Sequence, residues 1–177
     1  MNIWHDIKKE RITPGDFVAV IEIPTGSKQK YELDKDTGFL MLDRILYTST
    51  HYPANYGFIP RTFGFDHDPL DVLVLCTQTI APLTLVRCHP IGVITMLDGR
   101  KRDEKIIALP FADPNYAGVD SIEQLSPHIF DEIRHFFEVY KMLENKQTIV
   151  DDEVRGKKEA IRVIEKAIDD YREKFIR

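Results

Sequence analysis

The sequence predicts an α+β fold that is mainly β, with two helices of the C-terminal half packed on a small antiparallel sheet or barrel. The first two thirds of the chain consist of short β-branched stretches separated by Gly, Pro and Asp turns. In the last third, apolar residues recur every three or four positions, as on one face of a helix. Strands and helices do not alternate, so a doubly wound parallel sheet is not expected. No linker or repeat divides the chain, and residues 1–177 are expected to form a single domain.

Strands are expected where β-branched and apolar residues are bounded by turn residues. A turn at residues 36–38 separates two such stretches and predicts a hairpin. The first arm of this hairpin alternates apolar with charged side chains, so one of its faces is charged. The expected strands are residues 17–23, 30–34, 39–47, 71–76, 85–96 and 105–109.

Two helices are expected in the last third of the chain. The first begins after Ser126-Pro127, because serine is a frequent N-cap and proline is favoured at the first helical position. The second covers about residues 157–175. The expected apolar face of the first helix consists of Ile129, Ile133, Phe136, Phe137, Tyr140 and Leu143, and that of the second consists of Ile161, Ile164, Ile168, Tyr171 and Phe175.

Composition and charge exclude some classes of function. The 24 Lys and Arg residues are outnumbered by 29 Asp and Glu, for a net charge of -5, which is not the charge pattern of a protein that binds duplex nucleic acid. A local basic groove stays open. No apolar run approaches the ~18 residues of a membrane helix. Cys76 and Cys88 are expected to be buried thiols rather than a disulfide, and with no signal peptide recognised the cytoplasm is the expected compartment.

Two acidic stretches are the candidate site. Residues 66–71 place three carboxylates directly before an apolar strand, where like charges are costly unless a cation lies among them. A calcium EF-hand is excluded, since its sixth position would be Asp71 instead of Gly and its twelfth Thr77 instead of Glu. Residues 98–105 hold a second acidic group. Each stretch alone is also typical of a solvated turn or a charged hairpin tip, but together across a barrel mouth they suit hard cations such as Mg²⁺ or Mn²⁺.

Cations and phenols accompany these acids, mostly on either side of the two stretches, and point to an anionic, oxygen-rich ligand such as phosphate. They are Lys30, Arg44, Tyr52, Tyr56, Lys105, Tyr140 and Lys141. The sequence has no glycine-rich phosphate loop, no G-x-S-x-G motif and no plausible Cys/His nucleophile pair, which argues against a P-loop enzyme and against covalent catalysis.

A series of short motifs runs through roughly residues 13–145, of which D-x-D-P-x-D-V at residues 66–72 is the most specific. The others are Glu22-Ile23-Pro24, Lys30-Tyr31-Glu32, Asp43-Arg44, Tyr52-Pro53-Ala54-Asn55-Tyr56-Gly57, Arg87-Cys88, Pro90-x-Gly92, Asp98, Asp103-x-Lys105 and residues 135–141. In these motifs and in their order, the chain resembles the family I inorganic pyrophosphatases.

This resemblance implies a distorted five-stranded OB-like barrel with two helices packed on it, and Mg²⁺-dependent hydrolysis of pyrophosphate by a metal-activated water without a covalent intermediate. It implies metal ligands at Asp66, Asp71, Asp98, Asp103 and Glu32, with Glu22 acting through water. Asp68 is implied as the general base, Lys30, Arg44, Tyr56, Lys105, Tyr140 and Lys141 as substrate-binding residues, and Tyr52 as their support. Several Mg²⁺ ions per site are implied, with Mn²⁺ or Zn²⁺ as substitutes.

One departure from the family pattern is Gly99, where bacterial members often have Glu, followed by Arg100-Lys101-Arg102. It predicts weaker metal binding at the outer site. The chain length implies a homohexamer, with the first helix near His135 at an interface, although a solvent-facing or core histidine is the plainer interpretation. Two other functions stay open: an OB-fold binder of nucleic acid, and a metal-dependent phosphohydrolase acting on nucleotides or polyphosphate.

Overall fold

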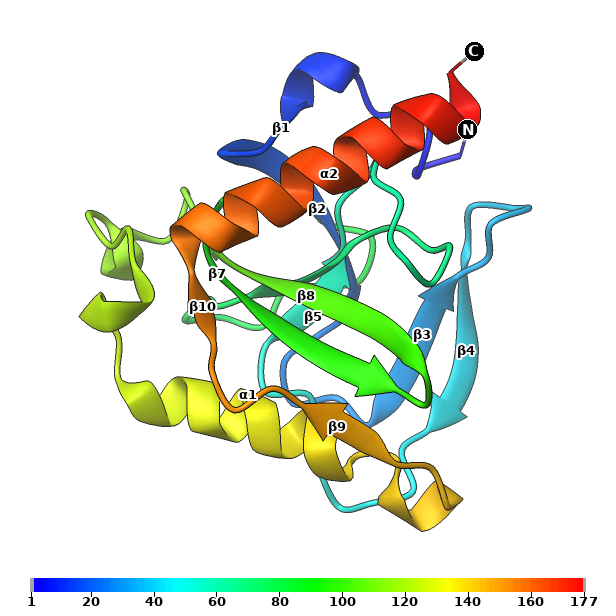
Figure 1. Cartoon of the computed structure of the whole chain (residues 1–177), viewed down its shortest axis with the longest axis vertical. Coiled ribbons are helices and arrows are strands. Elements are labelled where there is room, and N and C mark those ends of the chain that lie inside the picture. Colours follow the sequence, from blue (N-terminus) through cyan, green and yellow to red (C-terminus); the bar gives the residue numbers. More distant parts are fainter. Residues whose placement is uncertain (1, 177) are drawn as a thin grey trace.

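The computed structural model describes residues 2–176 and shows a ring of strands with one helix on either side (Figure 1). Five strands close the ring, because the last pairs again with the first. In order round the ring they are β2 (Asp16–Ile23), β5 (Asn55–Phe58), β6 (Asp71–Val74), β8 (Lys101–Pro110) and β7 (Leu85–Asp98). Strands β6 and β8 run parallel, whereas the other neighbours in the ring are antiparallel. The expected OB-like barrel is thereby confirmed.

Shorter strands extend this ring. Strand β1 (Ile12–Thr13) pairs with β2, and both β9 (Thr148–Val150) and β10 (Arg155–Gly156) pair with β7. The expected hairpin forms a separate two-stranded sheet of β3 (Gln29–Leu33) and β4 (Leu40–Ile45). Single 3-10 turns occur at η1 (Lys9–Arg11), η2 (Pro114–Tyr116), η3 (Ile122–Gln124) and η4 (Met142–Glu144).

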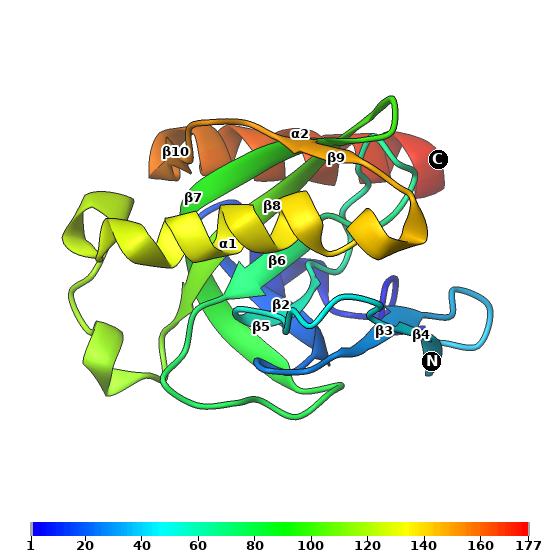
Figure 2. The ribbon, with the colours of Figure 1, turned by 90° about the horizontal axis from the view of Figure 1, so that it is seen from below.

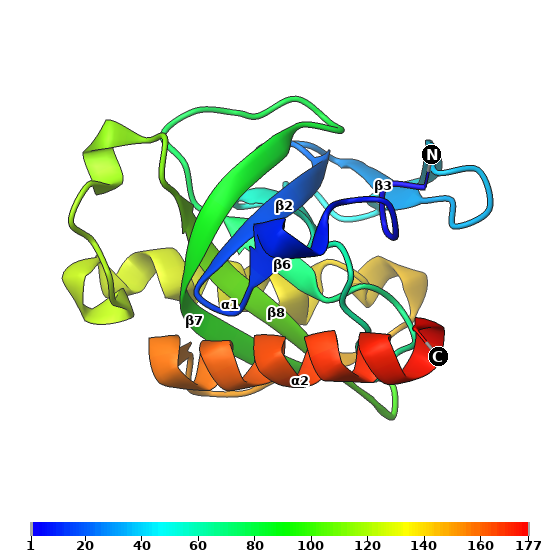
Figure 3. The same ribbon diagram turned by 90° about the horizontal axis from the view of Figure 1, so that it is seen from above.

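Helices α1 (Pro127–Val139) and α2 (Lys157–Phe175) lie on opposite sides of the strands, as the views from below and above show (Figures 2 and 3). Each buries one face in its own apolar cluster. Helix α1 contributes Phe130, Ile133, Phe136 and Phe137 to a cluster that includes Tyr52 and Tyr56. Helix α2 contributes Ala160, Ile164, Ala167 and Ile168 to a cluster with residues of β2, β6 and β8.

Some expected limits are wrong. Helix α1 ends at Val139, so Leu143 lies in η4 and is exposed rather than on the helix face. Ser126 does precede the helix, but its side chain makes no capping hydrogen bond. Strand β8 begins at Lys101, four residues before the expected start, because it continues the hairpin with β7.

Strand β5 was not expected from the sequence, and it carries a site residue. A Cβ atom at Gly57 would lie 1.8 Å from the carbonyl oxygen of Val20, so only glycine allows β5 to approach β2. The neighbouring Asn55 is fully buried; its Oδ1 accepts from Thr25 N and Ile80 N, at 3.1 and 2.9 Å. Asn55 and Gly57 are therefore both held in place, and so is Tyr56 between them.

Two further expectations concern the chain as a whole. In the stretch 2–176, no helix has the length and apolar character needed to cross a membrane. Cys76 and Cys88 are free thiols, as expected; Cys88 is buried, whereas Cys76 is only partly buried.

Candidate active site

The loop between β5 and β6 presents the first acidic group. Thr62 is buried, and its hydroxyl donates to the carbonyl of Ile59 at 2.6 Å while accepting from Leu70 N at 2.8 Å, which closes the loop at its base. At the tip, Asp68 N donates to Asp66 Oδ1 at 3.1 Å. The loop therefore holds Asp66 and Asp68 in a fixed relation just before β6.

Strand pairing brings the other acids to the same place. Asp71 opens β6 and is the register partner of Lys105 on β8. Asp103 lies two residues before Lys105, on the same side of β8. Asp98 ends β7 at the tip of the β7–β8 hairpin, where Gly99 has a φ of 65°. This left-handed conformation explains glycine at position 99, since a glutamate there would be strained.

These side chains line one open cavity of about 880 Å³, including the solvent at its mouth. Seven acids and four lysines face it. The acids are Glu22, Glu32, Asp66, Asp68, Asp71, Asp98 and Asp103, and the lysines are Lys30, Lys35, Lys105 and Lys141. Tyr56 and Tyr140 are part of the same wall. The two acidic stretches of the sequence thus meet across the barrel mouth.

The lysines are paired with the acids. Lys105 is almost fully buried, and its ammonium donates to Asp71, Asp103 and Tyr56 at 2.7, 3.0 and 2.9 Å. The other three lysines each form an ion pair within the cavity, namely Lys30 with Glu32, Lys35 with Asp68 and Lys141 with Asp98. Every lysine of the cavity is therefore bound to a predicted metal ligand or to the predicted base.

Three of the acids are held in unfavourable surroundings for a negative charge. Burial, together with the neighbouring Asp71, raises the pKa of Glu22 to about 8, although Leu33 N donates to its Oε1 at 2.9 Å. Burial raises the pKa of Asp103 to about 6, even though Lys105 opposes the shift. The pKa of Asp66 is raised by burial and by Asp71 as well. The cavity holds more negative charge than its lysines compensate.

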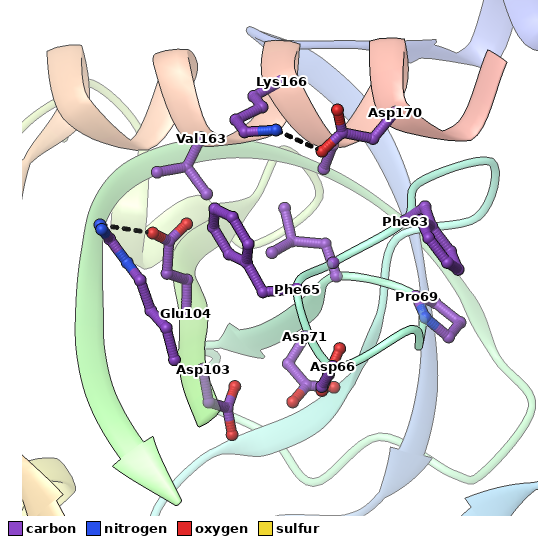
Figure 4. Close-up of a pocket in the computed structure, with 14 residues that line it drawn as sticks. Phe63, Phe65, Asp66, Pro69, Asp71, Asp103, Glu104, Val163, Lys166 and Asp170 are labelled. Atoms are coloured by element: carbon purple, nitrogen blue, oxygen red, sulfur yellow. Dashed lines mark hydrogen bonds and ion pairs between the residues drawn. The ribbon is translucent and has the colours of Figure 1, made fainter. Parts of the chain in front are cut away.

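A smaller crevice of about 380 Å³ lies behind these acids, between the Asp66 loop, β8 and α2. Figure 4 shows Asp66, Asp71 and Asp103 at one end of it, and Glu104 beside Phe65 further in. Glu104 pairs with Arg102 at 2.7 Å, and Lys166 on α2 pairs with Asp170. The crevice connects the helix to the back of the predicted metal site.

Two predicted site residues do not line the cavity. Arg44 Nε donates to Glu144 at 3.1 Å, and its guanidinium also pairs with Asp43. Its Nη2 atom is buried, and its N–H groups find no hydrogen-bond acceptor among residues 2–176. Tyr52 is buried behind the cavity, with its ring centroid 5.3 Å from that of Tyr56. That position suits a supporting residue.

Lys35, Thr62 and Glu144 contribute to the site without having been expected there. Lys35 follows directly after the charged strand, so its place in the hairpin turn was a usable signal. The roles of Thr62 and Glu144 depend on contacts between distant segments, for which the sequence has no periodic pattern.

Comparisons with known proteins agree on one family. Residues 19–172 match the profile of a family described as inorganic pyrophosphatase. A soluble inorganic pyrophosphatase of Chlamydomonas reinhardtii is 49% identical over 173 residues, 98% of this chain and 90% of the relative. An inorganic pyrophosphatase of Aquifex pyrophilus is 44% identical, over 96% of this chain and 97% of the relative. Among solved structures, the inorganic pyrophosphatase of Helicobacter pylori is 47% identical with a TM-score of 0.86, covering 90% of this chain and 95% of that one.

Proposed function

The chain belongs to the family I inorganic pyrophosphatases, which are hydrolases, and we propose that its cavity hydrolyses pyrophosphate to two phosphates with Mg²⁺ and without a covalent intermediate. The observation that carries this proposal is the convergence of seven acids and four lysines in one cavity. Such a site accommodates cations and a highly anionic substrate together. Without added positive charge, this excess of carboxylates would repel pyrophosphate.

The donor set of the cavity fits Mg²⁺. All of its acidic ligands are carboxylates, whose oxygens hard cations prefer. Burial, and to a smaller extent the neighbouring Asp71, raises the pKa values of Glu22, Asp66 and Asp103, and a bound cation would offset both effects. Among residues 2–176 no three His, Cys, Asp or Glu side chains already converge closely enough to hold a metal; Lys105 lies between Asp71 and Asp103 instead. We propose Asp66, Asp71, Asp98, Asp103 and Glu32 as direct ligands and Glu22 as a ligand through water, with Mn²⁺ or Zn²⁺ as substitutes.

The residues of the cavity divide the chemistry between them. Bound Mg²⁺ would supply positive charge and make a water molecule more acidic. Asp68 is about half exposed, so its carboxylate would be able to accept a proton from such a water. Lys30, Lys105 and Lys141 donate to phosphoryl oxygens, where negative charge develops in the transition state. Arg44, outside the cavity lining, is proposed to donate to the same oxygens once substrate is bound. The buried hydroxyls of Tyr56 and Tyr140 stay protonated, because burial raises their pKa, and can donate to the same oxygens.

A comparison of substrates tests the proposal. Phosphate release should be rapid from pyrophosphate and slow from ATP in Mg²⁺, should persist to some degree in Mn²⁺ or Zn²⁺, and should stop in EDTA. Faster release from ATP or polyphosphate would instead favour a nucleotide or polyphosphate hydrolase. Binding of single-stranded nucleic acid that weakens with salt, without any phosphate release, would favour an OB-fold binder.

Assembly and compartment are part of the same proposal. We propose a homohexamer in the cytoplasm, with exposed His135 of α1 near an interface. Light scattering of the purified protein tests the hexamer, and a monomeric mass at micromolar concentration would contradict it.

A further inference from the structure

One lysine connects the candidate site to the N-terminal segment. Lys35 lies in the turn between β3 and β4, and its ammonium forms an ion pair with Asp68 inside the cavity. The side chains of Lys35 and Asp68 are 48% and 46% exposed. An ion pair this exposed contributes little stability, about 0–1 kcal/mol. Lys35 is therefore not fixed to Asp68 and can exchange it for another anionic partner.

The other side of Lys35 faces Trp4. The Lys35 ammonium lies 5.9 Å from the centre of the Trp4 ring, and Asn2 Nδ2 donates to the backbone carbonyl of Lys35 at 2.8 Å. Trp4 itself is buried, and its indole Nε1 donates to the carbonyl of Thr62 at 2.9 Å. Thr62 also closes the base of the loop that carries Asp68. The same loop therefore holds both Asp68 and Trp4, the two side chains that the Lys35 ammonium faces.

We propose that Lys35 is a further substrate-binding residue, whose ammonium leaves Asp68 for a phosphoryl oxygen when pyrophosphate enters the cavity. The ammonium has three donors and a flexible stem, so it can follow the ligand. Pyrophosphate oxygens carry more negative charge than one carboxylate and compete for the ammonium. Leaving Asp68 also frees that carboxylate to accept a proton. This inference rests on the function proposed above.

Steady-state kinetics tests whether Lys35 binds the substrate or is an ordinary surface lysine. Lys35→Gln should lower kcat/KM for pyrophosphate roughly tenfold to hundredfold, mostly through a higher KM, because a hydrogen bond to a charged group is lost. Lys35→Arg keeps the charge and should recover most of the loss. Lys158→Gln, which removes a charge from an exposed position on α2, should behave as the unchanged protein.

Tryptophan fluorescence tests the movement itself, because Trp4 is the single tryptophan of the chain. With inorganic phosphate and Mg²⁺ as the probe, departure of the ammonium from the indole should change Trp4 emission. The change should be absent in Lys35→Gln and present in Lys158→Gln, with circular dichroism showing that both variants are folded. Wild-type kcat/KM in Lys35→Gln, or unchanged emission while calorimetry shows phosphate bound, would overturn the inference. An unchanged protein that releases no phosphate from pyrophosphate would instead contradict the proposed function.

Discussion

Asp71 and Lys105 are register partners on the parallel strands β6 and β8, and the Lys105 ammonium donates to Asp71 Oδ2 at 2.7 Å. Lys105 also donates to Asp103 and to Tyr56, so all three of its protons are used in an almost fully buried position. Desolvation opposes the charge of a buried lysine, but these neighbours outweigh it, and the pKa of Lys105 lies well above its usual value. The ammonium thus holds two acids together across the strand pair.

Lys105→Met should destabilise the metal-free protein by up to about 3–5 kcal/mol at pH 7, because the partly buried Asp71 and Asp103 would be left without a counter-charge. Mg²⁺ should restore part of this loss, and phosphate release should stay low. Urea unfolding in EDTA and in Mg²⁺ measures both effects. The control is Lys101→Met, an exposed lysine at the start of the same strand, which should change stability little. Equal stability of the two variants would show that the buried pairs do not hold the acids together.

The sequence predicted the site better than it predicted the local structure around it. Two acidic stretches, each next to a predicted strand, implied that their side chains meet at the mouth of the barrel. Asp66, Asp71, Asp98 and Asp103 do line one cavity there. The strand that carries Tyr56 was missed, because residues 55–58 contain a glycine and show little alternation, and their burial on both faces depends on β2 and β6. Residue roles came from the resemblance to a family, since pairing between distant segments has no local signal.

Glu22 should make the stability of the metal-free protein depend on pH. Its pKa is about 8 in the folded protein, against an ordinary value of 4.5 for a glutamate in the unfolded chain. Between these two pH values the unfolded chain has lost the proton and the folded protein retains it, so stability is fully present below about pH 4.5 and falls as the pH rises through 8. The loss amounts to at most about 5 kcal/mol.

Glu22→Gln should remove this part of the pH dependence, which urea unfolding in EDTA at pH 5, 7 and 9 measures. The exposed Glu10→Gln serves as the control. If Glu22→Gln and the unchanged protein lost stability in parallel between pH 5 and 9, the assignment of the pH dependence to Glu22 would be wrong.

Asp68→Asn should lower kcat by roughly 100- to 10,000-fold, the usual contribution of a general base, while leaving Mg²⁺ affinity nearly unchanged. Asp68 is about half exposed and pairs with a flexible lysine, which suits proton transfer better than metal binding. Phosphate release gives kcat, and calorimetry gives Mg²⁺ affinity. A collapse of Mg²⁺ affinity would make Asp68 a metal ligand instead. Asp66→Asn is the matched comparison, and in it the affinity should fall.

Lys30→Ala should raise KM and lower kcat/KM roughly tenfold to hundredfold, because the variant loses a charged donor to phosphate. Lys30 pairs with Glu32 and, at 3.1 Å, with Asp43 near the cavity mouth, and such pairs contribute about 0–1 kcal/mol to stability. The melting temperature should therefore change little. Lys28→Ala, at a lysine that does not line the cavity, should leave KM unchanged. Unaltered kinetics in Lys30→Ala would remove Lys30 from the site.

Gly57→Ala should destabilise the barrel by about 4 kcal/mol or more. The added methyl group would lie 1.8 Å from the Val20 carbonyl oxygen and 2.9 Å from the Cα atom of Ile21, and backbone atoms cannot move aside as a flexible side chain can. Relief requires β5 to separate from β2, which would displace Tyr56 from Lys105 and lower activity. Gly15→Ala, where an added Cβ meets nothing within 4 Å, is the control for glycine replacement alone. A melting temperature for Gly57→Ala equal to that of Gly15→Ala would mean that β5 and β2 tolerate a wider spacing than the ring of strands suggests.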